Sequence, residues 1–141
     1  MKVYFSANHR NLERDLPLYR AIIDAIHSEG HTLVNGWVET ANNKWSPEFK
    51  SDDWVSVCIQ ARCGVEDADV VLAEASGETG FGVGFEVACA LSKGKKVYIL
   101  IQKSEINNSY AYGLDRHEVK VEEYEPQKVR AVVRRILGEV K

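Results

Sequence analysis

Residues 70–101, VVLAEASGETGFGVGFEVACALSKGKKVYILI, decide the fold because they join two strands through a turn and a helix. The run Val70–Glu74 has the apolar, β-branched character of a buried strand. Glycines from Gly80 onward open a helical stretch that ends at Lys93-Gly94, and Lys96–Ile101 is again nearly all apolar, as in a central strand covered on both faces. A strand, helix, strand unit connects parallel neighbours. We therefore predict a parallel sheet with helices on both faces.

Glu86 is the one charged residue between Gly80 and Leu91, where a solvated surface helix would carry several charges. A lone carboxylate among apolar and small residues costs free energy unless it is paired, protonated or used in chemistry. The preceding strand places it near the carboxyl end of the sheet, where open α/β sheets bind ligands. Glu86 is therefore the first candidate for a functional residue.

The rest of the chain continues the alternation of strands and helices. Residues 2–6 predict a first strand that leads into the polar loop 7–11, and apolar residues with helical spacing predict a helix from Leu12 to Ser28 that Gly30 ends. Residues 35–49 show no clean period and predict a long loop that could cover a site. The remaining predicted elements are a second strand at 31–34, a helix capped by 51–53 and running to about 65, a fifth strand within 117–124 and a closing helix at 127–140.

Length and composition fit one soluble domain. The 141 residues form a chain long enough to bury a core, and the net charge of −3 gives no general attraction to nucleic acid or anionic membrane. Cys58, Cys63 and Cys89 form no CxxC pair and fall in segments that look helical and partly buried, so we expect neither a disulfide framework nor a metal site. No apolar run has membrane-spanning length and no signal-peptide pattern is present, so we expect a cytoplasmic protein.

Four segments occur in an order and at distances that resemble a known family: Val3–Arg10 (VYFSANHR), Ala68–Glu74 (ADVVLAE), Gly82–Glu86 (GVGFE) and Gly94–Val97 (GKKV). Together they resemble the nucleoside 2-deoxyribosyltransferase family, including its deoxynucleoside 5'-monophosphate N-glycosidase branch. The resemblance runs from residue 3 to about residue 114. It implies one domain over residues 1–141, with a Rossmann-like (flavodoxin-like) five-stranded parallel sheet in the order 2-1-3-4-5. It also implies a small nucleoside or nucleotide substrate and no cofactor.

The resemblance assigns roles to residues of the first strand, of the loop that follows it and of the helix that contains Glu86. Glu86 would be the nucleophile that attacks the anomeric carbon, and the hydroxyl of Tyr4 would orient it. The alternatives from the residues alone are a carboxylate that caps or pairs within its helix and a core tyrosine. Asn8, His9 and Arg10 would wrap the 5'-phosphate, a task that suits a guanidinium because it donates two parallel hydrogen bonds. A solvated loop arginine is the alternative for Arg10.

The glycine turn also has two interpretations. Its GxGxG spacing and the lack of an acidic residue after the following strand give little support to a dinucleotide site. The glycines either allow close helix packing or let a ligand approach a helix start whose free N–H groups favour anions. In the family, the position of Gly80 is an aspartate in the transferase branch and a serine in the monophosphate branch. The absence of an acid at position 80 removes repulsion and favours phosphate, whereas the carboxylate of Glu78 would oppose phosphate binding. The residues expected to accept the anion are Thr79, Gly80, Gly82 and Gly84.

Asn108 and Ser109 lie in a segment that the family sends into the site of a neighbouring subunit. The resemblance therefore implies a homodimer unit with shared sites. An ordinary polar loop is the alternative. Among Trp37, Trp45 and Trp54, one could stack on the base, while core packing is the other role.

One departure from the family concerns the acid that assists the leaving base. Counting back from Asp69 puts Ala61 where the family has an aspartate. Either Asp53, Asp67 or Asp69 takes over, or the base is protonated differently, or the chain has lost catalysis.

The favoured hypothesis is hydrolysis, or base exchange, of the N-glycosidic bond of a (2'-deoxy)nucleoside 5'-monophosphate through a glycosyl-glutamate. A nucleoside 2-deoxyribosyltransferase acting on unphosphorylated nucleosides, a catalytically weakened nucleotide-binding or signalling module, and NAD glycohydrolysis are the alternatives.

Overall fold

The computed structural model describes residues 1–40, 54–77, 80–105, 112, 114 and 119–140. Five strands form one sheet in the order β2-β1-β3-β4-β5, and every neighbouring pair is parallel. This confirms the predicted sheet and its order. The strands are β1 (Lys2–Ala7), β2 (Thr32–Leu33), β3 (Val70–Glu74), β4 (Lys96–Gln102) and β5 (Val119–Tyr124).

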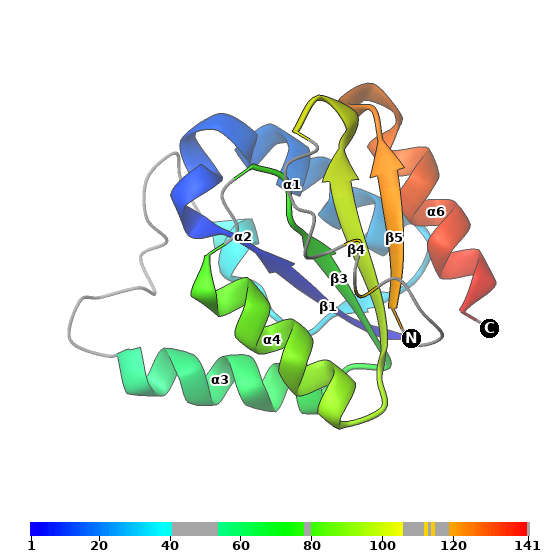
Figure 1. Cartoon of the computed structure of the whole chain (residues 1–141). Coiled ribbons are helices and arrows are strands. Elements are labelled where there is room, and N and C mark those ends of the chain that lie inside the picture. The colour runs from blue at the N-terminus through cyan, green and yellow to red at the C-terminus, as the bar shows by residue number, and fades with distance from the viewer. Residues whose placement is uncertain (41–53, 78–79, 106–111, 113, 115–118, 141) are drawn as a thin grey trace.

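Helices cover both faces of the sheet, and Figure 1 shows α1 and α6 on one side with α3 and α4 on the other. Parallel neighbouring strands must be joined by a crossover connection that returns the chain to the same edge of the sheet. These crossovers are mostly helices here, and they pack on the faces of the sheet. The α-helices are α1 (Leu12–Ser28), α2 (Trp37–Thr40), α3 (Trp54–Asp67), α4 (Phe81–Ser92) and α6 (Val129–Glu139); single 3-10 turns form η1 (His9–Asn11), η2 (Lys103–Glu105) and η3 (Pro126–Lys128).

The first strand divides its side chains between two apolar cores. Val3 and Phe5 belong to the core beneath α1 and α6, whereas Tyr4 belongs to the core beneath α3 and α4. Successive side chains of a strand point to opposite faces of the sheet, so this division is a direct result of the strand geometry. Ser6, the next residue with the parity of Tyr4, is fully buried. The strand therefore directs two hydroxyl groups toward the α4 side.

Most predicted boundaries agree with the structure, and α1 covers the predicted residues 12–28. Gly30 follows it with φ of 75°, a conformation that glycine adopts without strain. The loop prediction for 35–49 is wrong at residues 37–40, which form the short helix α2. Its Val38 is fully buried beside α1, and the Glu39 carboxylate lies 2.7 Å from His27 Nε2, so packing and a polar contact stabilise a turn that has no sequence period.

The prediction that the cysteines are partly buried is wrong for Cys58 and Cys63, which are exposed on α3. The reason is that α3 rests on the sheet along a narrow stripe, and Val65 is its buried residue within the described range. Over the described residues, no helix is both long and apolar enough to cross a bilayer.

Candidate active site

The candidate site lies where the chain leaves β1 and β3 at the carboxyl edge of the sheet. These two strands are direct neighbours, and Ala7 pairs with Glu74 at their last register position. The loop after β1 and the turn after β3 therefore begin side by side, as expected for ligand sites of open parallel sheets. The helix α4 then starts at Phe81 and carries Glu86 back over the face that contains Tyr4.

Both oxygens of the Glu86 carboxylate accept hydrogen bonds from hydroxyl groups of β1. Tyr4 Oη donates to Oε1 at 2.8 Å, and Ser6 Oγ donates to Oε2. Tyr4 is 2% exposed and Ser6 is fully buried, whereas Glu86 itself is half-buried. The structure thus brings Glu86 and Tyr4 together as the sequence predicts. Ser6 was missed, although its spacing of two residues from Tyr4 in a strand was an available signal.

Burial dominates the ionisation of this group. The surrounding protein raises the pKa of Glu86, and the hydrogen bonds from Ser6 and Tyr4 oppose that rise by stabilising the carboxylate. Burial, followed by the nearby negative charge of Glu86, raises the pKa of Tyr4, which keeps the phenol a hydrogen-bond donor. Within the described chain, no basic side chain forms an ion pair with Glu86. A carboxylate held by neutral donors remains more basic and more nucleophilic than one held by a cation.

The loop after β1 packs against the turn before α4. Asn8 is 5% exposed and caps η1, its Oδ1 accepting from the backbone N–H of Arg10 at 3.1 Å. A Cβ added to Gly80 would lie 3.2 Å from that same Oδ1, so Asn8 and Gly80 are in close contact. Arg10 is exposed. The loop and the glycine turn, which the sequence analysis assigned to one phosphate, are therefore adjacent.

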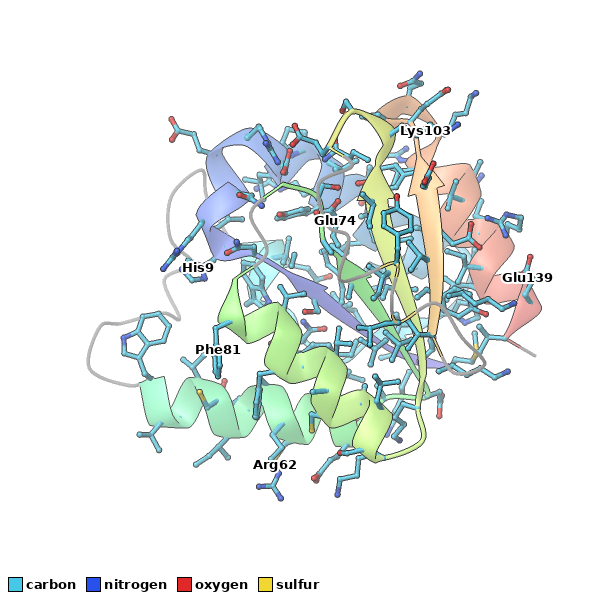
Figure 2. The ribbon with its side chains drawn as sticks, viewed as in Figure 1. His9, Arg62, Glu74, Phe81, Lys103 and Glu139 are labelled. Atoms are coloured by element: carbon cyan, nitrogen blue, oxygen red, sulfur yellow. The ribbon has the colours of Figure 1, made fainter. Side chains whose placement is uncertain are left out.

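His9 extends this edge toward α3. Its ring centroid lies 6.3 Å from that of Trp54, the first residue of α3, and Figure 2 shows His9 and Phe81 on the same side of the molecule. Burial, followed by the positive charge of Arg10, lowers the pKa of His9, so its ring is neutral at physiological pH. The site therefore has aromatic side chains beside its polar loop.

The glycines at the start of α4 leave the helix surface open. A Cβ added to Gly82 or Gly84 would find no heavy atom of the described residues within 4 Å, so close packing among these residues does not explain either glycine. Gly80 is the N-cap of α4, in an extended conformation without a side chain to cap the helix. Gly80 and Gly82 therefore add no side chain that would shield the first N–H groups of α4, which have no partner within the helix.

Two of the three acids considered as replacements for the family aspartate lie elsewhere. Asp69 accepts from the backbone N–H of Lys2 at 2.7 Å, and Asp67 binds the Lys2 ammonium at 2.6 Å. Lys2 begins β1, so both acids stand at the amino edge of the sheet, opposite the end where Ser6 and Glu86 meet. Ala61 is half-buried on α3. Asp53, Trp45, Glu78, Thr79, Asn108 and Ser109 lie outside the described residues.

A second buried carboxyl group, Glu74, occupies the opposite face of the sheet, at the end of β3 (Figure 2). It is 1% exposed, and its Oε1 accepts from Tyr124 Oη at 2.9 Å and from Ser76 Oγ. Burial raises the pKa of Glu74, and these hydrogen bonds counter the effect. Ser76 Oγ also accepts from the backbone N–H of Gln102 at 2.7 Å. The network ties the turn that leads to Gly80 to strands β4 and β5, and sequence reasoning missed it because its members come from distant segments.

An apolar surface covers the outer side of α3 and α4. The large hydrophobic side chains that are exposed in the described structure all belong to these two helices, namely Trp54, Val55, Ile59, Phe81 and Phe85. Trp54, Val55, Ile59 and Phe85 line an open hollow of about 390 Å³ together with Cys58 and Arg62. Within the described residues, no three His, Cys, Asp or Glu side chains are grouped to hold a metal ion.

Comparisons with known proteins identify the fold. No family model matches the chain, and no curated protein matches its sequence. The CMP N-glycosidase BcmB of Clostridium botulinum has a similar structure, with a TM-score of 0.65, 16% sequence identity and 99% of both chains covered. BlsM, known from a solution structure, has a TM-score of 0.72 and 14% identity, with 99% of this chain and 93% of BlsM covered. The chain therefore has the fold of these two proteins, and the roles of its site residues remain predictions.

Proposed function

We propose that the protein cleaves the N-glycosidic bond of a (2'-deoxy)nucleoside 5'-monophosphate, by hydrolysis or base exchange, with Glu86 as nucleophile. The observation that carries this proposal is the half-buried Glu86 carboxylate, held on both oxygens by Tyr4 and Ser6 on a helix whose first turn has open positions at Gly82 and Gly84. The fold adds support, because a structure of the same fold is described as a CMP N-glycosidase.

The proposed reaction consists of two displacements at the anomeric carbon. A carboxylate oxygen of Glu86 bonds to that carbon while the C–N bond breaks and its electron pair leaves with the base. Water then attacks the same carbon, and the electron pair of the ester C–O bond returns to Glu86. Over both steps water supplies the hydroxyl that ends on the sugar and the proton that ends on the base. In base exchange, a second base replaces water.

The 5'-phosphate would lie at the junction of the β1 loop and the start of α4. Asn8 and Gly80 are in contact there, so Arg10 and the N–H groups of the helix start belong to one locality. A helix N-terminus and a guanidinium both stabilise phosphate oxygens. The open positions at Gly82 and Gly84 give a ligand room to approach the backbone. Thr79, which we also assign to the phosphate, and the base contact proposed for a tryptophan are supported by sequence alone.

We further propose that two copies of the chain associate through the apolar surface of α3 and α4. Ile59 is 57% exposed and Phe85 is 40% exposed, both line the same hollow, and contiguous apolar surface of this kind marks association sites. By contrast, α6 on the opposite layer carries ion pairs through Arg130, Arg134 and Arg135. A second copy would cover the apolar face and bring a neighbour's Asn108 or Ser109 toward the site, as the sequence resemblance implies.

The decisive experiment is a base-release assay. The purified protein is incubated with ribo- and deoxyribonucleosides, their 5'-monophosphates and NAD, and free base is measured by chromatography. We expect base from a monophosphate, and Glu86→Gln should lower the rate at least about 10³-fold, as loss of a covalent nucleophile does. Glu66→Gln is the matched control, since Glu66 is exposed on α3 and pairs with Lys93 and Arg62.

Each other outcome identifies a different function. Base release from unphosphorylated nucleosides alone would indicate a transferase-like enzyme, and release of nicotinamide from NAD alone would indicate a glycohydrolase. If neither the wild type nor Glu86→Gln releases base, but a monophosphate raises the melting temperature, the protein is a binding module and the enzymatic proposal is wrong.

A further inference from the structure

Ser6 contacts the proposed nucleophile Glu86, although the sequence alone predicts no role for this residue. It is fully buried, two residues beyond Tyr4 on β1, and its hydroxyl donates to Oε2 of Glu86. Tyr4 donates to the other oxygen, Oε1, at 2.8 Å. The regular alternation of β1 places both hydroxyls on the α4 side, so the strand supplies a pair of donors that matches the two oxygens of one carboxylate.

Two donors on different oxygens restrict the carboxylate in a way that one donor does not. The last torsion of a glutamate side chain is broad, so a single hydrogen bond from Tyr4 to Oε1 opposes rotation about the bond that joins Cγ to Cδ only weakly. A second hydrogen bond, from Ser6 to Oε2, narrows that rotation further because turning the plane would then break both contacts. The direction of the remaining lone pairs is then set by β1, whose Tyr4 and Ser6 are both buried.

We propose that Ser6 is a positioning residue for Glu86, fixing the plane of the carboxylate together with Tyr4 where the position of Ala61 offers no acidic partner. The inference rests on the proposed function, because positioning matters only if Glu86 attacks the sugar. A misplaced nucleophile loses rate even when the substrate still binds. Loss of the Ser6 hydroxyl should therefore lower kcat while KM changes little.

The same contact affects ionisation in a defined direction. Among the described residues, Tyr4 from β1 is the titratable group that bonds to Glu86, and the charge of Cys89, about one turn further along α4, acts on Tyr4. Burial raises the pKa of Glu86 and the Ser6 hydroxyl lowers it. Without the Ser6 hydroxyl, less of the effect of burial is offset, so the pKa of Glu86 rises further. Activity that requires the carboxylate would then appear only at higher pH.

The test compares Ser6→Ala with the wild type and with Ser92→Ala. Ser92 is a matched control because it is an exposed residue of α4 whose hydroxyl bonds to the backbone oxygen of Cys89 and not to Glu86. Ser6→Cys serves as a second variant of similar shape with a weak donor, should Ser6→Ala fail to fold. The carboxyl carbon of Glu86 is titrated by ¹³C NMR, assigned through its absence in Glu86→Gln, and kcat and KM are measured against pH.

We expect the Ser6 variant to raise the pKa of Glu86, to move the acidic limb of kcat to higher pH and to lower kcat roughly tenfold, as loss of a hydrogen bond to a charged group predicts. Ser92→Ala should match the wild type. An unchanged NMR titration, or a shifted titration with unchanged kcat, would overturn the positioning role. If the wild type releases no base, the proposed function fails, and the NMR titration alone decides whether Ser6 holds Glu86.

Discussion

Gly64→Ala tests whether the packing of α3 against Tyr4 is necessary for the site. Gly64 lies in α3, and a Cβ at this position would stand 2.8 Å from Cε2 and 3.0 Å from Cδ2 of the Tyr4 ring. The ring edge would have to retreat by about 0.6 Å to reach an ordinary contact of 3.4 Å. Tyr4 is 2% exposed, so its ring has little room to move.

Two effects of opposite sign act on stability. Alanine is favoured over glycine in a helix by about 1 kcal/mol, whereas overpacking a core costs about 1–3 kcal/mol. Gly138→Ala in α6 isolates the first effect, because a Cβ there meets no heavy atom of the described residues within 4 Å. We therefore expect the free energy of unfolding of Gly64→Ala to lie about 1–3 kcal/mol below that of Gly138→Ala, the cost of the overpacking alone.

The effect on activity should be larger than the effect on folding. A displaced Tyr4 ring carries its hydroxyl away from Oε1 of Glu86, to which it donates at 2.8 Å. Because sub-ångström to 1 Å misplacement of a catalytic group costs up to about 100-fold in rate, we expect kcat of Gly64→Ala to fall by about 10- to 100-fold. Urea unfolding and the base-release assay measure the two quantities on the same samples.

Equal stability and equal kcat for Gly64→Ala and Gly138→Ala would refute this reasoning, because the ring would then not be confined by α3. A loss of stability with normal kcat would show that the contact packs the core without orienting Glu86. Tyr4→Phe provides the reference for complete loss of the hydroxyl, and kcat of Gly64→Ala should not fall below it.

Three further predictions concern other parts of the structure. Burial raises the pKa of Glu74 above its ordinary value of 4.5, so the folded state binds the proton more tightly and the free energy of unfolding falls as pH rises from about 4.5 through the folded-state pKa. Glu74→Gln should flatten this fall in urea unfolding measured against pH, and an unchanged slope would contradict a buried, protonatable Glu74. Arg10→Ala should raise KM for a nucleoside monophosphate by about 10- to 100-fold but leave KM for the matching nucleoside nearly unchanged, since only the phosphate accepts paired hydrogen bonds from the guanidinium. Equal changes in both KM values would show that Arg10 does not bind the phosphate. Ile59→Glu should convert a dimer to a monomer in light scattering, while Gln127→Glu, an exposed residue of η3, should not; a monomeric wild type would rule out the proposed interface.

The alternation of elements could be predicted from local patterns. The β-branched run Val70–Glu74 and the helical apolar spacing of residues 12–28 reflect steric and burial preferences that act over a few residues, and both elements formed at the predicted positions. The helix α2 was not predictable in this way, since Val38 and Glu39 are held by contacts with α1. The single-domain assignment and the cytoplasmic location stay predictions.

The sequence by itself determined the parallel sheet and selected Glu86, because a lone charge in an apolar helix is conspicuous without any structure. It also contained Tyr4 and Ser6 at a spacing of two, which a strand directs to one face. Only the tertiary structure decided that both hydroxyls meet Glu86, more than 75 residues away, and that Asp67 and Asp69 lie at the opposite edge. Tyr124 and Glu74 likewise meet across 50 residues. Such pairs depend on sheet register and helix packing, which bring distant segments together after the local patterns have been satisfied.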